Sequence, residues 1–478
     1  MEVERQMGIE RAFLVRACWV DEQWDEAESL LMELCELVRT LDIPIIASRL
    51  IAYREPQAKY LVGGGKAQEV SEEAKNAGAS LLVFDNELTP AQQRNWSKLC
   101  GLPVIDRRDV ILEIFAQRAR TREARLQVEL ARLEHALPRL VRAWSHLGQQ
   151  AGGIGGRGEG ETQLEQDKRR IRAQIDRLRR EIAEVRANRA TQRKDRNRVP
   201  VPNAALVGYT NAGKSSLLRA LTGADVLVED KLFATLDPTT RRLALPNNQP
   251  LLLTDTVGFV RNLPHGLVDA FNATLEEAAL ADFLIHVLDA SQAEFSKYYE
   301  TTIRVLAELG AEGKPVLVVF NKMDLVDMER RVILRRVFPD AVYVSAVTGD
   351  GLGDLVERIS EFVAVGLETF ELAVPQSRSD VVARLHREGD VRAINYSGDE
   401  VELRVRLPRR ARSWVMPYLL RGRAGGDLGD GVFSGPAKVA LAGKGISDDV
   451  EDSLTRKDFS GDVIEVSVGA NDGDVELV

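Results

Sequence analysis

The sequence of 478 residues predicts a multidomain α/β protein, because three patterns follow one another along the chain. Near the N-terminus, strand-like apolar stretches alternate with amphipathic helical ones. A strongly charged helical region with a glycine-rich middle comes next. After it, several apolar strands each end in a short glycine-rich or polar motif. A chain of this length exceeds one ordinary core, so several domains are expected.

Changes in composition divide the chain into five segments. We predict an N-terminal βα domain over residues 1–107, a helical hairpin over 108–199, a P-loop domain over 200–366 and a small C-terminal α+β domain over 367–420. Residues 421–478 form an acidic extension of unknown fold. This extension is either a lineage-specific addition or a poorly ordered tail.

The N-terminal segment is typical of a small domain with a parallel sheet. Strands are predicted at 12–18, 44–47 and 80–84, and helices at 24–39 and 89–99. Strands that alternate with helices favour a parallel sheet. We interpret Gly63–Lys66 as a simple loop, with a phosphate-binding turn as the alternative.

Two helical patterns, roughly 109–135 and 162–192, flank the glycine-rich stretch 148–160 and predict an antiparallel hairpin. The tip is either a flexible linker or a probe that orders against a crowded surface such as folded RNA. Although the whole chain has a net charge of −9, residues 168–198 carry thirteen Lys/Arg and four Asp/Glu, a local charge of +9. Such a basic element can bind phosphate backbones.

Composition also indicates the cellular compartment in which the protein is expected. The three cysteines form no Cys-x-x-Cys pair, which indicates a reducing environment and structural roles. The N-terminus shows no signal-peptide pattern, and no apolar run approaches membrane-spanning length. The five histidines show no metal-ligand spacing. We therefore expect a soluble, cytoplasmic, monomeric protein without stable membrane insertion.

The first chemical motif is a phosphate loop, Gly208–Ser215, between an apolar strand and a helix-forming stretch. Its glycines let backbone N–H groups surround phosphates. Lys214 is expected to reach the β- and γ-phosphates, and the Ser215 hydroxyl to ligate Mg²⁺. The candidate phosphate-binding residues are Gly208, Tyr209, Thr210, Asn211, Ala212, Gly213, Lys214, Ser215 and Ser216.

The second motif begins where the predicted strand 250–254 ends. Asp255 places a carboxylate near the metal, and Gly258 can approach the γ-phosphate closely because it has no side chain. Between the two motifs lies a polar switch loop, residues 233–241. Within it Thr235 is the candidate for a second magnesium-ligating hydroxyl, with two other threonines, Thr239 and Thr240, as alternatives. The candidate metal ligands are thus Ser215 and Thr235, and the candidate catalytic groups are Lys214, Thr235 and Gly258.

Two further motifs select the base. Asp324 can accept two hydrogen bonds from guanine, which adenine cannot offer. The Lys322 stem can cover the base, Asn321 can tie neighbouring loops together, and a backbone N–H of Ser345-Ala346 can meet the guanine O6. All four motifs together predict a Mg²⁺-dependent enzyme that binds GTP and GDP and hydrolyses GTP to GDP and phosphate.

One position departs from the usual GTPase pattern. Many GTPases have a glutamine directly after the glycine that corresponds to Gly258, and it orients the attacking water. This chain has Phe259 at that position. Hydrolysis is therefore expected to be slow unless a partner, a metal or another loop completes the site. Asn211 offers one route, since an asparagine there helps hold K⁺ near the phosphates in related GTPases.

The chain resembles the HflX family of ribosome-associated GTPases, within the translation-factor-related GTPases. The resemblance covers about residues 10–410 and rests on four stretches, Asp109–Arg120, Gly156–Glu165, Phe233–Arg241 and Asp255–His265. Glu159 replaces a proline that is usual in the family's hairpin tip.

This resemblance implies binding to the large ribosomal subunit and its rRNA, with the hairpin directed towards the peptidyl-transferase region. It also implies stimulation of hydrolysis by the ribosome, splitting or rescue of idle or stalled ribosomes, and a second nucleotide-binding activity in the N-terminal domain. The alternative is a GTP-regulated RNA chaperone or ribosome assembly factor, because both functions need a basic probe and a switch.

Overall fold

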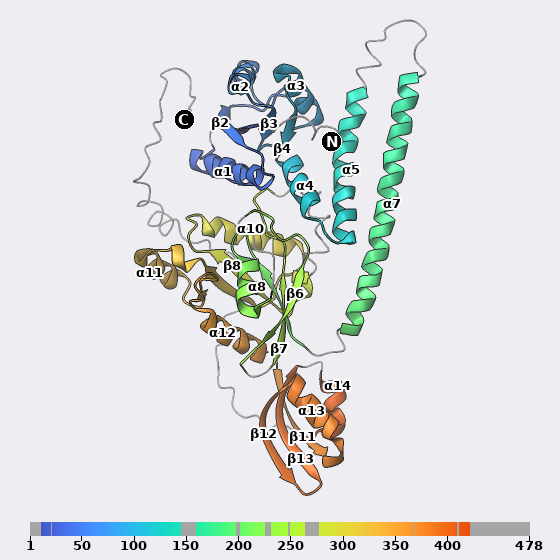
Figure 1. Cartoon of the computed structure of the whole chain (residues 1–478), viewed down its shortest axis with the longest axis vertical. Coiled ribbons are helices and arrows are strands. Elements are labelled where there is room, and N and C mark those ends of the chain that lie inside the picture. Colours follow the sequence, from blue (N-terminus) through green and yellow to red (C-terminus); the bar gives the residue numbers. More distant parts are fainter. Residues whose placement is uncertain are drawn as a thin grey trace.

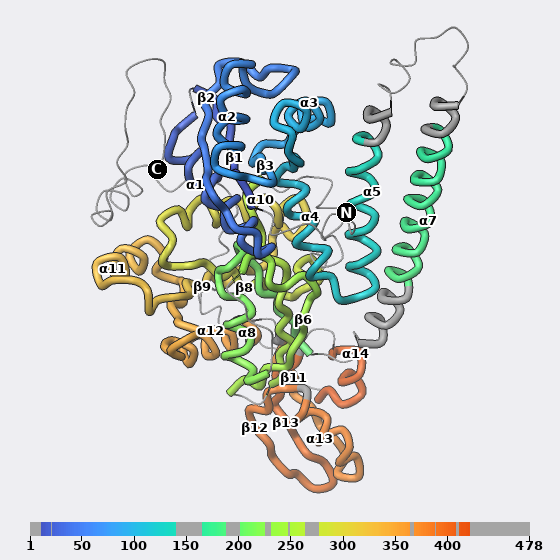
Figure 2. Tube along the Cα trace, turned by 45° about the horizontal axis from the view of Figure 1, so that its top comes forward, coloured from blue at the N-terminus to red at the C-terminus, as the bar shows by residue number. Residues whose placement is uncertain are grey.

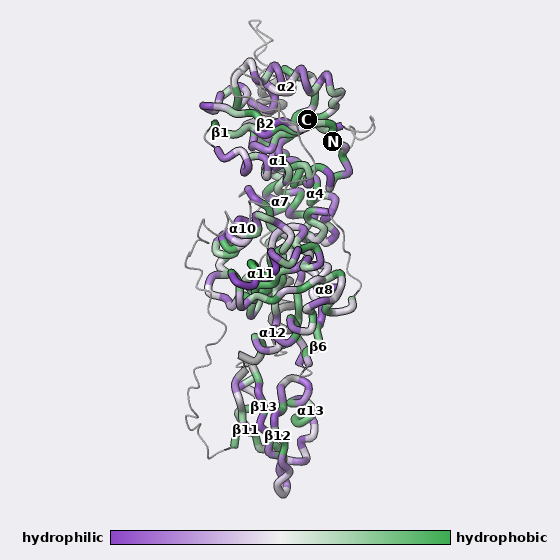
Figure 3. The backbone as a smooth tube through the Cα atoms, turned by 90° about the vertical axis from the view of Figure 1, so that its left-hand side faces the viewer, coloured by the Kyte–Doolittle hydropathy of each residue, from purple (hydrophilic) through white to green (hydrophobic). Residues whose placement is uncertain are grey.

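The computed structural model describes residues 11–20, 22–144, 159–196, 201–224, 231–246, 249–262, 277–365, 367–408 and 411–420. Most of the predicted glycine-rich tip and the acidic extension lie outside these residues. The N-terminal, P-loop and C-terminal domains follow one another along the longest axis, and the helical hairpin runs beside the first two (Figure 1). In each domain the hydrophobic stretches concentrate in its interior strands (Figure 3). Among the described residues, no helix combines the length and apolar character needed to cross a membrane.

The N-terminal domain has the predicted parallel sheet (Figure 2), with strand order β2-β1-β3-β4. Its elements are β1 (Ala12–Trp19), α1 (Trp24–Thr40), β2 (Ile45–Tyr53), α2 (Gly64–Asn76), β3 (Leu81–Phe84), α3 (Pro90–Cys100) and β4 (Val104–Asp106). The prediction of a loop at Gly63–Lys66 is wrong, because α2 begins at Gly64. Ala67, Val70 and Ala74 are fully buried at helical spacing, so their packing outweighs the poor helix propensity of the glycines.

The hairpin comprises α4 (Arg107–Arg118), α5 (Arg122–Trp144) and α7 (Glu159–Arg196). The predicted single helix over 109–135 is therefore wrong, since the helix is interrupted between α4 and α5. Ala119 is extended (φ −64°, ψ 108°), and the Thr121 hydroxyl accepts a hydrogen bond of 3.1 Å from the N–H of Ala124. This side-chain cap starts a new helix.

Helices α5 and α7 lie side by side over much of their length (Figures 1 and 2). Ile175, Leu178 and Ile182 are each 5% exposed, as expected for the apolar stripe of α7. Arg179 of α7 also pairs with Glu134 of α5 at 2.8 Å. The predicted antiparallel pairing of two helices is thus confirmed.

The P-loop domain has a six-stranded sheet of order β10-β9-β8-β5-β7-β6, in which only β6 pairs antiparallel. Its strands are β5 (Asn203–Val207), β6 (Thr239–Ala244), β7 (Pro250–Asp255), β8 (Phe283–Asp289), β9 (Val316–Asn321) and β10 (Val342–Tyr343). Its helices are α8 (Lys214–Thr222), α10 (Phe295–Glu308), η2 (Met323–Leu325), α11 (Met328–Val337) and α12 (Leu352–Val365). Parallel strands bring their carboxyl ends to one edge, and the four predicted motifs follow β5, β7, β9 and β10 at that edge.

The C-terminal domain is a three-stranded antiparallel sheet of order β11-β13-β12 with one longer helix. It contains β11 (Leu367–Pro375), η3 (Gln376–Arg378), α13 (Ser379–Glu388), β12 (Asp390–Ser397), β13 (Glu400–Pro408), α14 (Arg412–Val415) and η5 (Met416–Tyr418). The domain contains both helices and strands, as predicted for an α+β domain. Buried Leu372, Leu385 and Leu403 join the helix to the sheet.

Candidate nucleotide-binding site

The loop between β5 and α8 depends on two glycines. Gly208 has φ +146°, and a Cβ there would lie 2.2 Å from the carbonyl oxygen of Val287. Gly213 has φ +86°, and a Cβ there would lie 2.2 Å from Nδ2 of Asn321. At these two points the backbone of β8 and the side chain of Asn321 leave no space for a side chain in the loop. Only glycine allows the loop to curl into a cradle of N–H groups.

The Lys214 ammonium lies inside this cradle. Its side chain is buried, and Nζ donates to the carbonyl oxygens of Gly208 and Tyr209 at 3.1 and 2.8 Å. Burial lowers the pKa of Lys214 to about 8, although the nearby Asp255 carboxylate acts in the opposite direction. A cation bound to its own loop in this way is positioned to exchange those carbonyls for phosphate oxygens.

Three oxygen groups that could ligate a metal lie close together beside the Lys214 ammonium. The Thr235 hydroxyl lies 2.8 Å from the Ser215 hydroxyl and 3.0 Å from Oδ2 of Asp255, and Ser215 donates to the same carboxylate oxygen at 2.5 Å. The alternative threonines, Thr239 and Thr240, open strand β6, and the Thr240 hydroxyl contacts Thr254 instead.

This donor set fits Mg²⁺, which prefers hydroxyl, carboxylate and water oxygens. Oδ1 of Asp255 is completely buried and has no hydrogen-bond partner among the described residues. Burial raises the pKa of Asp255, and the Lys214 charge opposes that rise. A cation beside this carboxylate would satisfy a buried charge that is otherwise costly.

The loop that follows β7 closes over the phosphate loop. A Cβ at Gly258 would lie 2.7 Å from Cα of Thr210 and 3.0 Å from Nζ of Lys214. The N–H of Phe259 donates to the Gly208 carbonyl at 3.2 Å, and the Phe259 carbonyl accepts from the N–H of Thr210 at 2.8 Å. The Phe259 ring is only 2% exposed. It therefore packs in the core and cannot orient a water molecule.

The base-side motifs are held by side-chain hydrogen bonds. Nδ2 of Asn321 donates to the carbonyl of Ala212 at 3.0 Å, which joins this motif to the phosphate loop. The Ser345 hydroxyl donates to Asp324 at 2.6 Å and orients the carboxylate predicted to read guanine. The N–H groups of Ser345 and Ala346 already donate to Asp350 and Asn321, each at 3.0 Å. A guanine O6 would need to compete for one of these N–H groups.

Lys322 adopts a left-handed conformation with φ +64° at the end of β9. Its ammonium pairs with Asp289 at 2.8 Å, so the side chain lies between two strand ends. A pocket at this site is lined by Thr210, Asn211, Lys214, Ser216, Thr235 and Gly258, with others from the phosphate loop, the switch loop and the loop after β7.

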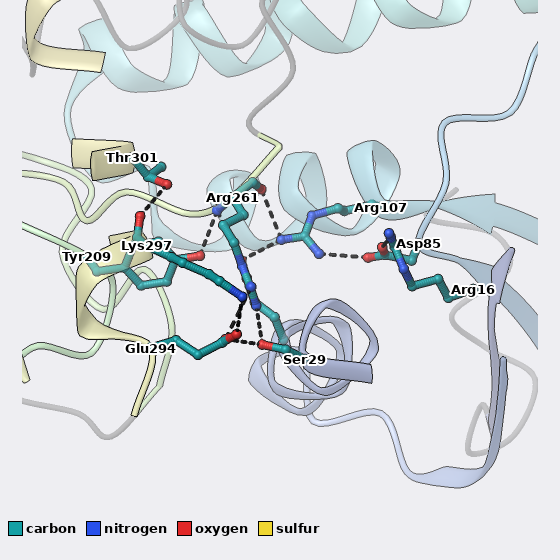
Figure 4. Close-up of polar contacts among 10 residues, drawn as sticks. Arg16, Ser29, Asp85, Arg107, Tyr209, Arg261, Glu294, Lys297 and Thr301 are labelled. Atoms are coloured by element: carbon teal, nitrogen blue, oxygen red, sulfur yellow. Dashed lines mark hydrogen bonds and ion pairs between the residues drawn. The ribbon is translucent and has the colours of Figure 1, made fainter. Parts of the chain in front are cut away.

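The sequence alone does not show that the phosphate loop is fastened to the N-terminal domain. The Tyr209 ring points away from the pocket and stacks on Tyr298 at 4.1 Å, and its oxygen accepts the Arg261 N–H at 2.7 Å. The Arg261 guanidinium then reaches Glu33 of α1 at 2.9 Å. It also donates to Ser29 of the same helix at 2.7 Å (Figure 4).

A chain of buried charges continues from there into the N-terminal domain. Arg107 pairs with Glu33, donates to the Arg261 carbonyl at 3.1 Å and pairs with Asp85 at 2.7 Å. Asp85 also pairs with Arg16. Burial alone would lower the pKa of Arg107, but Glu33 and Asp85 raise it above its ordinary value. No sequence signal links these residues, because members in direct contact lie as far as 228 positions apart.

A glycine cradle on a strand–helix junction, a hydroxyl–carboxylate cluster beside its lysine and a base-reading Asn-Lys-x-Asp motif define a P-loop GTPase. Family descriptions agree with this class. Residues 203–322 match "50S ribosome-binding GTPase", and 28–116 and 118–196 match the N-terminal and middle regions of "GTP-binding GTPase".

Relatives identify the family. The chain is 50% identical to GTPase HflX of Akkermansia muciniphila over 418 residues, 85% of this chain and 96% of that protein. It is 43% identical to GTPase HflX of Escherichia coli over 384 residues, 79% of this chain and 89% of that one. A solved GTP-binding protein of Sulfolobus solfataricus in complex with GDP matches 74% of this chain and 98% of its own, at 25% identity and a TM-score of 0.41. The chain belongs to the HflX family of GTPases and hydrolyses GTP.

Proposed function

We propose that this GTPase binds the large ribosomal subunit through its helical hairpin and splits or rescues idle or stalled ribosomes in a nucleotide-dependent way. It would act in the cytoplasm as a monomer. The observation that carries the proposal is the exposed basic surface of α7. Arg169, Arg170 and Arg177 have side chains that are 81%, 80% and 74% exposed.

Two of these guanidinium groups are weakly held within the protein, whereas Arg177 pairs with Glu181 one helical turn away at 2.8 Å. Arg169 and Arg170 lie 3.8 and 3.9 Å from acidic partners on their own helix, and exposed pairs of this kind contribute little. A basic helix can exchange such partners for the phosphates of rRNA, with release of counterions. The match of residues 203–322 to a description that names the 50S ribosome supports this choice of partner.

We further propose that Mg²⁺ is bound by Ser215 and Thr235, with Asp255 behind them. The metal would neutralise phosphate charge when bound. Lys214 would stabilise the β- and γ-phosphates, and the backbone at Gly258 would approach the γ-phosphate. Because Phe259 is buried, no side chain at that position can orient water, so hydrolysis by the free protein would be slow. A ribosomal contact, or K⁺ near the exposed Asn211, would complete the site.

The test is sucrose-gradient sedimentation of intact ribosomes with the protein and GTP, GDP or a non-hydrolysable GTP analogue. We expect subunits to separate with GTP or the analogue but not with GDP. Binding to immature particles only, without splitting, would instead support an RNA chaperone or assembly factor.

A charge variant isolates the hairpin. Replacing Arg169, Arg170 and Arg177 with glutamine should reduce binding at least tenfold and flatten its salt dependence. A control that replaces the exposed Arg54, Lys98 and Arg336 with glutamine removes the same charge from other surfaces. Equal losses in both variants would contradict a role for α7.

A further inference from the structure

We infer that the base of the helical hairpin positions Thr235, and that Asp237 is the positioning residue through which it does so. The corner between α4 and α5 contacts the switch loop on both sides of Thr235. This inference rests on the proposed role of Thr235 as a ligand of Mg²⁺. It adds that occupancy of the metal site and the geometry of the hairpin base are energetically linked.

The polar part of the contact is a carboxylate at the start of a helix. Oδ2 of Asp237 accepts the N–H groups of Arg120 and Thr121 at 2.9 and 3.0 Å, and Oδ1 accepts the Thr121 hydroxyl at 2.6 Å. The Thr121 hydroxyl itself caps α5 through Ala124. Asp237 therefore holds the first turn of the hairpin, where a negative charge also interacts favourably with the helix dipole.

The apolar part of the contact flanks Thr235 on both sides. Leu232, Phe233 and Leu236 are 8%, 2% and 3% exposed and belong to the same core as α4 and α5. The Phe233 ring packs edge-on against Phe115 of α4, with ring centres 4.6 Å apart. The loop is thus anchored before Thr235 by buried Leu232 and Phe233, and after it by buried Leu236 and the Asp237 carboxylate.

Thr235 sits between these anchors with its hydroxyl among Ser215 and Asp255. A loop threonine without such anchors would sample many positions, and ordering it would cost part of the metal's binding free energy. Pre-positioning by the hairpin base removes that cost. Because linkage is reciprocal, a ligand that displaces the hairpin base must weaken the metal site, and metal binding must stabilise the hairpin base.

The test is the Mg²⁺ dependence of GTP hydrolysis by the full-length chain. Asp237→Ala should raise the Mg²⁺ concentration for half-maximal rate about tenfold, while the rate at saturating Mg²⁺ and the binding of GDP without Mg²⁺ change little, because three hydrogen bonds to a charged acceptor are lost. Asp237→Asn keeps the size and one acceptor and should give a smaller shift in the same direction. If both variants keep the parent's half-saturating Mg²⁺ concentration, the inference is overturned.

Two comparisons exclude a merely structural effect. Asp354→Ala removes an exposed carboxylate from α12 and should leave the half-saturating concentration unchanged. General damage at Asp237 would reduce the fraction of protein that binds nucleotide without moving that concentration, and this outcome also counts against the inference. Thr235→Ala tests the metal role separately. If Thr235→Ala shifts the Mg²⁺ dependence and Asp237→Ala does not, only the positioning role fails; if Thr235→Ala has no effect, the proposed metal site itself fails.

Discussion

Arg261 and Glu33 form a buried ion pair with 2.9 Å between Nε and Oε2, although 228 residues separate them in the chain. The pair connects the loop after β7, which closes over the phosphate loop, to helix α1 of the N-terminal domain. Arg107 contacts both members, so a single carboxylate serves two guanidinium groups. The loop nearest the predicted γ-phosphate site is thereby attached to another domain.

Replacing Glu33 with alanine should therefore destabilise the contact between the domains by about 3–5 kcal/mol, because two buried guanidinium groups lose their shared partner. Hydrogen exchange in α1 and in residues 255–262 would measure the effect, with faster exchange expected in both. Glu36→Ala is the matched control. Glu36 is 52% exposed and, in the part of the chain that the structure describes, pairs with the surface residue Arg39, so its loss should change little.

Asp324→Asn should weaken GTP binding by about 2–4 kcal/mol, because a charged acceptor for two guanine hydrogens is lost. The variant should bind xanthine nucleotides better, since xanthine carries a carbonyl where guanine has the amine. Calorimetric titration with both nucleotides checks this. Unchanged GTP affinity would remove Asp324 from the base site.

His286 is expected to make the P-loop domain sensitive to acid. It is fully buried in β8, stacks on Tyr299 at 5.0 Å, and neither ring nitrogen has a hydrogen-bond partner among the described residues. Burial, with a smaller effect of the Lys214 charge, lowers its pKa from 6.5 to about 3. The folded state therefore favours neutral histidine, so this contribution to stability is complete above pH 6.5 and is lost as pH falls towards 3.

Between pH 7 and pH 5 the loss attributable to His286 should be about 2 kcal/mol. Hydrogen exchange of β8, corrected for its intrinsic pH dependence, would measure the free energy of unfolding at both pH values. His286→Leu should remove that part of the pH dependence. If the parent and the variant lose stability equally, His286 is not the responsible group.

The free protein should hydrolyse GTP slowly, and purified large ribosomal subunits should accelerate the reaction by about 10³ or more, as completion of such a site from outside can do. Exchange of sodium for potassium tests the separate route through Asn211. Phosphate release measured with each addition distinguishes them. Fast turnover in sodium buffer that neither addition changes would show that another side chain already positions the water.

Chelation of Mg²⁺ should abolish hydrolysis while GDP remains bound, because the phosphate loop and the base-side motifs do not need the metal. Ser215→Ala should raise the Mg²⁺ requirement for hydrolysis without changing the preference for guanine. Nucleotide binding followed by fluorescence, with and without chelator, separates the two effects. Loss of GDP on chelation alone would show that nucleotide binding, and not only hydrolysis, requires the metal.

The class of protein could be predicted from the sequence, because each motif that defines it has a local requirement. The glycine spacing of 208–213 can be read without a structure because its requirement is local: positive φ and absent Cβ atoms. The start of helix α3 can also be predicted locally, because Thr89 caps the helix and Pro90 occupies its first turn. The parallel sheet of the N-terminal domain was predictable because strand–helix alternation allows few topologies.

Which side chains from distant segments meet could not be predicted from the sequence and became visible in the folded structure. The sequence left three threonines open as partners of Ser215, and the fold brings Thr235 to it while β6 takes the other two into the sheet. The break between α4 and α5 and the attachment of Asp237 to Thr121 depend on contacts 116 residues apart. Such contacts leave no periodic trace in the chain, because a single ion pair or hydrogen bond constrains two positions and nothing between them.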